Sequence, residues 1–85
     1  MGESIQNAQL MEALEAIETL KFRGFTATCG PTGSVVVDRW SHVRGVWHHH
    51  AGNYFWTDAG YTQPSFRVQN IEDAIAYTLN VIASA

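Results

Sequence analysis

The chain has 85 residues, of which 46% are hydrophobic and 12% aromatic, so it can form one small folded domain, 1–85, but no multidomain enzyme. Five Lys and Arg against eight Asp and Glu give a formal net charge of −3, which argues against a surface that neutralises many phosphates. Nucleic-acid binding is therefore the most remote of the functions considered.

Residues 4–23 are expected to form one amphipathic helix. Gly24 follows the last helical residue and suits the left-handed conformation that ends many helices, after which Phe25 can pack back on the helix. Apolar side chains recur at helical spacing, and most glutamates fall outside that stripe. The stripe is Leu10, Ala13, Leu14, Ile17 and Leu20, and the glutamates are Glu12, Glu15 and Glu18.

From residue 25 to 40 the hydrophobic period changes to two, which predicts a β-hairpin. The length of its loop decides which side chains share a face. A three-residue loop pairs Cys29 with Val35 and gathers the apolar residues on one face, whereas a four-residue loop mixes the faces. We therefore expect the three-residue loop, with its turn at Pro31 and Thr32.

A second hairpin is expected over residues 43–57. Its turn centres on either Ala51-Gly52 or Gly52-Asn53, and both registers give the same two faces, while Gly45 is a candidate β-bulge. One face holds Val46, His48, His50, Phe55 and Thr57, and the other holds Trp47, His49, Tyr54 and Trp56.

A loop over 58–64 and a short strand around 65–68 precede a second helix, for which Asn70 is the expected N-cap. The order α-β-β-β-β-(β)-α predicts an α+β fold, an antiparallel four- to five-stranded sheet with the N-terminal and C-terminal helices packed on one face. The apolar stripe of the second helix is Ile71, Ala74, Ile75, Thr78, Leu79 and Ile82.

The pair His48 and His50 is the most specific chemical feature. Residues two apart on a strand point the same way, so two imidazoles can share a metal ion or another ligand, although a metal site needs at least a third ligand. Arg44 lies nearby in sequence and can receive a carboxylate or phosphate. We expect His48, His50 and Arg44 to form any ligand-binding site, with surface histidines as the simpler interpretation.

The aromatic residues of the second hairpin have two interpretations. Trp47, Tyr54 and Trp56 are core if their face meets the helices, and a stacking platform if it does not; we expect core, because so short a chain needs large side chains inside. Trp40 is the better candidate for exposure. Cys29 is expected to be a buried, inert thiol on the inward face.

The function predicted from these features is a non-enzymatic protein-interaction or assembly module. Its open sheet face or an edge strand would contact another protein or a second copy in a homo-oligomer, and the alternative is a small-ligand or metal-binding protein using the histidine pair. We expect no cofactor. The first residues lack the pattern of a signal peptide, and no window has the ~20 apolar residues that cross a bilayer, so the expected location is cytoplasmic.

Overall fold

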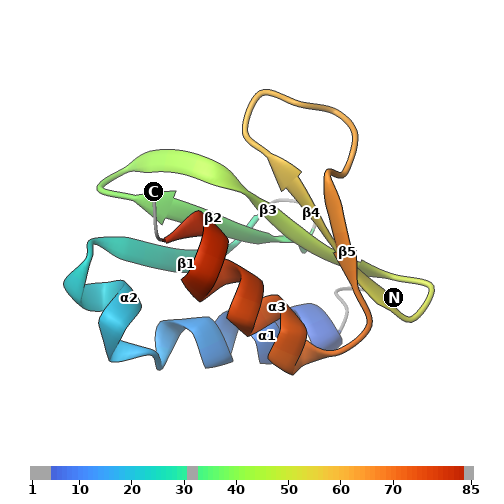
Figure 1. Ribbon diagram of the computed structural model, residues 1–85, viewed down its shortest axis with the longest axis horizontal. Coiled ribbons are helices and arrows are strands. Elements are labelled where there is room, and N and C mark those ends of the chain that lie inside the picture. The colour runs from blue at the N-terminus through green and yellow to red at the C-terminus, as the bar shows by residue number, and fades with distance from the viewer. Residues whose placement is uncertain (1–4, 31–32, 84–85) are drawn as a thin grey trace.

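The computed structural model describes residues 5–30 and 33–83. Within them, a five-stranded antiparallel sheet runs in the order β1-β2-β3-β4-β5, so every strand pairs with its neighbour in the chain. The helices all lie on one side of this sheet, and the loop between β4 and β5 rises on the other side (Figure 1). The elements are α1 (Ile5–Glu15), α2 (Glu18–Phe22), β1 (Phe25–Cys29), β2 (Val35–Arg39), β3 (His42–His50), β4 (Asn53–Asp58), β5 (Phe66–Val68), α3 (Ile71–Tyr77) and the π-helical turn η1 (Thr78–Ile82). The predicted α+β architecture is confirmed.

The N-terminal helix is not continuous, which corrects the expectation of one helix over 4–23. It breaks at Ile17, whose extended backbone (φ −84°, ψ 112°) separates α1 from α2. A 20-residue helix would be about 30 Å long, whereas a five-residue strand spans only about 17 Å. The break turns the chain back so that Leu20 stays over the sheet and is buried.

The two hairpins adopt the predicted registers. Cys29 lies opposite Val35, as the three-residue loop requires, and the expected turn at Pro31 and Thr32 lies outside the described residues. In the second hairpin the turn centres on Ala51 and Gly52, both with positive φ, which is the two-residue turn that matches the twist of a hairpin.

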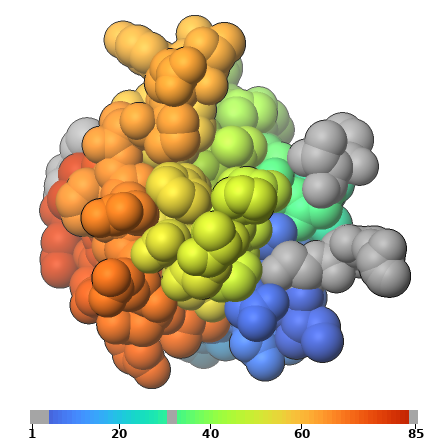
Figure 2. All heavy atoms as spheres, turned by 90° about the vertical axis from the view of Figure 1, so that its right-hand side faces the viewer, coloured from blue at the N-terminus to red at the C-terminus, as the bar shows by residue number. Residues whose placement is uncertain are grey.

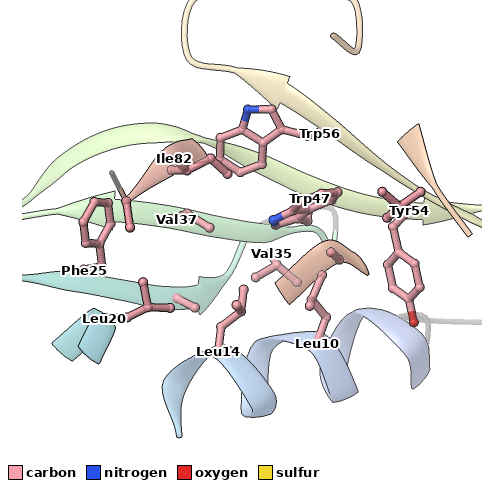
Figure 3. Packing of buried hydrophobic residues seen from close by; sticks show 14 residues of the cluster. Leu10, Leu14, Leu20, Phe25, Val35, Val37, Trp47, Tyr54, Trp56 and Ile82 are labelled. Atoms are coloured by element: carbon pink, nitrogen blue, oxygen red, sulfur yellow. The ribbon is translucent and has the colours of Figure 1, made fainter. Parts of the chain in front are cut away.

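The core lies between the helices and one face of the sheet. Trp47 and Trp56 are opposite each other on β3 and β4, and both are buried at 0% and 1% exposure, so their face is the inner one. Leu10 and Leu14 rise from α1 toward this layer (Figure 3). The stripe of the C-terminal helix also packs here, as predicted.

The other side of the sheet carries no helix, and we call it the open face. Its side chains follow from strand alternation and register. They include Thr26, Thr28, Val36, Asp38, Val43, Val46, His48, His50, Phe55, Thr57 and Arg67.

Candidate functional site

A groove of about 610 Å³ lies on the open face. Strands β3 and β4 form its floor, and the loop over 59–65 forms one wall through Thr62 and Pro64. The same loop projects from the molecule above the β3–β4 hairpin in Figure 2. We call this site the open-face groove; its lining residues are Ser34, Val46, His48, His50, Phe55, Thr57, Thr62 and Pro64.

The floor of the groove is apolar and bordered by hydrogen-bonding groups. Val46 and Phe55 are half-buried, so part of each side chain remains available to a ligand. Thr57 lies opposite Val46, and His48 lies opposite Phe55. Cross-strand neighbours on one face are within contact distance, so each of these two pairs places an apolar side chain beside a polar one.

The two histidines of the groove are exposed and lie side by side, as predicted. The ring centroids of His48 and His50 are 6.1 Å apart, and the ring planes differ by only 18°. The Nδ1 atom of His48 is 3.3 Å from the hydroxyl oxygen of the buried Ser34. This hydrogen bond holds the ring in place and leaves Nε2 directed away from Ser34, as the atom that a ligand can reach.

The pair provides two metal ligands and no more. Across residues 5–30 and 33–83, no group of three or more His, Cys, Asp and Glu side chains could hold a metal ion. Structural and catalytic zinc sites take three or four protein ligands.

The structure directs Arg44 away from the histidine pair. Between Val37 and Asp38 the β2–β3 register shifts, so that Arg44 and Gly45 form the β-bulge expected at Gly45. The Arg44 guanidinium then lies 6.0 Å from the ring centroid of Phe25, a core residue of the helix-covered side. A bulge re-aims a side chain because strand alternation is interrupted there.

Arg67 takes the place on the open face that the sequence suggested for Arg44. It lies opposite Phe55, which in turn lies opposite His48. Phe66, its neighbour in the chain, stacks on Tyr77 on the helix side with ring centroids 3.9 Å apart, so Arg67 points the other way. In a three-residue strand, alternation alone does not reveal the face, so Arg67 could not be identified from the sequence pattern.

The groove has no acidic side chain among its lining residues. Asp38 is the carboxylate on the open face of β2, but it lines a separate recess with Trp40 and Thr26. Asp58 is already engaged, since its carboxylate accepts hydrogen bonds from the Trp56 indole N–H at 2.8 Å and the Ser65 hydroxyl at 3.2 Å. No carboxylate therefore stands beside the two histidines among the residues that line the groove.

The structure also places the other residues considered in the sequence analysis, namely His49, Trp40 and Cys29. His49 packs edge-on against Tyr54 on the inner side, with ring centroids 4.8 Å apart, and Trp40 is 65% exposed, both as expected. The prediction that Cys29 is buried is wrong: it is exposed, because it is the last residue of the edge strand. The backbone N–H of His49 donates to the side-chain oxygen of the buried Asn7 at 2.9 Å, a contact that nothing in the sequence pattern indicated.

Comparison of the chain with protein-family models, with curated proteins and with solved structures found no match. Among the described helices, none is long and apolar enough to cross a membrane.

Proposed function

We propose that this chain is a non-enzymatic protein-interaction module whose open-face groove binds an extended segment of a partner protein. The observation that carries the proposal is a groove with a half-buried apolar floor on the face of the sheet that the helices leave uncovered. Concave, mostly apolar surfaces with a few convergent polar groups are the usual form of a binding site.

The spacing of the groove residues suits an extended ligand. Val46, His48 and His50 follow one another at alternate positions of β3, about 6.6 Å apart in a strand. An extended peptide repeats its own side chains at the same interval. Successive side chains of such a ligand can therefore meet successive groove positions.

The face supports this role better than the free edge of β1 does. The hydrogen bonds from Gly30 N–H to Ser34 and from Trp40 N–H to Gly24 direct the even-numbered residues of β1 toward β2. Phe25 and Ala27 then direct their backbone groups off the edge, yet both residues are buried beneath α1 and α2, at 2% and 3% exposure. A partner strand would find little exposed edge there.

A binding role also agrees with the groups around the histidines. Ser34 and His48 are in contact, but Ser34 is buried, and no carboxylate lines the groove to orient the imidazole. A catalytic serine needs an accessible hydroxyl, a base and a group that orients the base. The exposed Cys29 lines a different recess, together with Met11 and Ala8.

The test is to select peptides from a random display library on the full chain and to measure their affinity for two variants. Phe55→Glu places a carboxylate on the groove floor, and Thr28→Glu makes the same charge change on the open face outside the groove. We expect Phe55→Glu to weaken binding by about tenfold or more, because a central apolar contact is lost, and Thr28→Glu to leave it nearly unchanged.

Chemical-shift mapping on the unmodified chain makes the result independent of how well either variant folds. The selected peptides should shift the resonances of Val46, His48, His50 and Phe55. Peptides that bind both variants equally, or that shift residues elsewhere, would contradict the proposal.

A further inference from the structure

We infer that the segment bound in the open-face groove presents a carboxylate, which Arg67 and His48 hold above the ring of Phe55. This inference rests on the proposed function and specifies the chemistry of the ligand. It follows from the cross-strand row that joins these three residues and from the charges around it.

The row runs across three neighbouring strands. His48 on β3 lies opposite Phe55 on β4, and Phe55 lies opposite Arg67 on β5. Two strand spacings separate the outer members, about 10 Å between their Cα atoms. An arginine side chain and an imidazole that flank the same residue on one face of the sheet, at this distance, are long enough to reach a small group placed above the central phenyl ring.

Both outer members keep donors for a ligand. The side chain of Arg67 is exposed and makes no hydrogen bond or ion pair with another described residue, and its guanidinium matches the two oxygens of a carboxylate. His48 uses Nδ1 on Ser34 and keeps Nε2. In the tautomer whose Nδ1 accepts from the Ser34 hydroxyl, Nε2 carries the proton and can donate to a carboxylate.

No negatively charged side chain lines the groove, so nothing among its lining residues would repel an anion. His50 stacks on His48 and adds a second basic group, while the loop contributes the uncharged Thr62 and Pro64. The nearby carboxylates are the engaged Asp58 and the separate Asp38 described above. A cationic ligand would meet Arg67 and two imidazoles with no compensating charge, so a carboxylate is the complementary group.

The apolar floor favours a carboxylate attached to a carbon chain over a free inorganic anion. Phe55 and Val46 can contact methylene or aromatic groups, which a phosphate or sulfate ion lacks. An acidic side chain beside an apolar residue on an extended segment satisfies the donors and the floor together.

The test compares 3-phenylpropionate with its neutral counterpart 3-phenylpropanamide, which has the same ring and chain without the charge. NMR titrations of the full chain should show that the carboxylate shifts the imidazole signals of His48 and His50 and the side-chain signal of Arg67, and binds more tightly than the amide.

Two variants with a matched control locate the effect. Arg67→Gln should weaken 3-phenylpropionate by about two- to fivefold, the size expected of a solvent-exposed ion pair. Lys21→Gln removes the same charge from a residue that lines another recess, and should have no effect. His48→Ala should also weaken 3-phenylpropionate, because the Nε2 donor is lost.

The outcomes separate this inference from the proposed function. The inference of a bound carboxylate would be overturned if the acid and the amide bind equally and the library peptides occupy the groove without enrichment in Asp or Glu. The groove would then remain a peptide site. Library peptides that never map to the groove would overturn both. Selected peptides that are rich in Asp and Glu and that map to the groove would support both.

Discussion

At the scale of single residues, one polar pair inside the core determines how the sheet meets the C-terminal helix. The Trp47 indole N–H donates to the Thr78 hydroxyl at 3.0 Å, and the same hydroxyl donates to the carbonyl of Ala74 at 2.8 Å. Trp47 and Thr78 are both 0% exposed. Each polar atom is buried and partnered, so the pair holds the helix in one position against β3.

Replacing Thr78 with Val should destabilise the fold by about 1–3 kcal/mol, because the buried indole N–H loses its acceptor while side-chain volume is kept. Urea denaturation gives the free energy of unfolding. The control is a double-mutant cycle with Trp47→Phe, which removes the donor. In that background Thr78→Val should cost much less, and strictly additive effects would contradict the role given to this hydrogen bond.

At the scale of elements, the bulge in β3 depends on a close approach of β3 to β4 at Gly45. Gly45 lies where a Cβ atom would be 2.4 Å from the carbonyl oxygen of Thr57 and 2.5 Å from the ring of Trp56. Only glycine allows the backbone of β3 to approach β4 this closely. The bulge also accounts for the direction of Arg44, since alternation is interrupted at these two residues.

Gly45→Ala should therefore lower the free energy of unfolding by about 3 kcal/mol or more, since a backbone oxygen and a buried ring must move. Gly60→Ala is the matched control: its φ is +88°, but nothing lies within 4 Å of the added methyl group, so it should cost only about 1 kcal/mol. Thermal and urea unfolding of both variants measure the difference. Equal losses would show that close packing at Gly45 is not the reason for glycine there.

The elements also show which features were predictable from the sequence. Strand alternation placed Trp47 and His48 on opposite faces, and the need of a short chain for large core side chains favoured Trp47 as the inward one. The break at Ile17 was missed, because helical periodicity carries no information about length: a 20-residue helix would be longer than the short strands on which it packs. Arg67 was missed because three residues give too little alternation to assign a face.

At the scale of the whole molecule, the fold divides its ionisable groups between two environments. The histidine pair lies on the open face, whereas the hydroxyls of Tyr54 and Tyr77 belong to side chains packed on the helix side. This division follows from covering one face of the sheet and leaving the other bare. The packed tyrosines can therefore affect stability without belonging to the open-face groove.

Stability should fall in alkaline solution because of the two packed tyrosines. Burial, and to a smaller extent the negative charge of Glu72 for Tyr54 and of Asp58 for Tyr77, raises the pKa of both phenols above the ordinary value of 10.0. The folded state then holds these protons more tightly than the unfolded state, so the stabilisation is complete below about pH 10 and is lost as the pH rises through the folded-state pKa. Urea denaturation from neutral pH upward should show this decline, and it should be smaller in the Tyr54→Phe, Tyr77→Phe double variant, which keeps both rings. An identical decline in that variant would assign the alkaline transition to other groups.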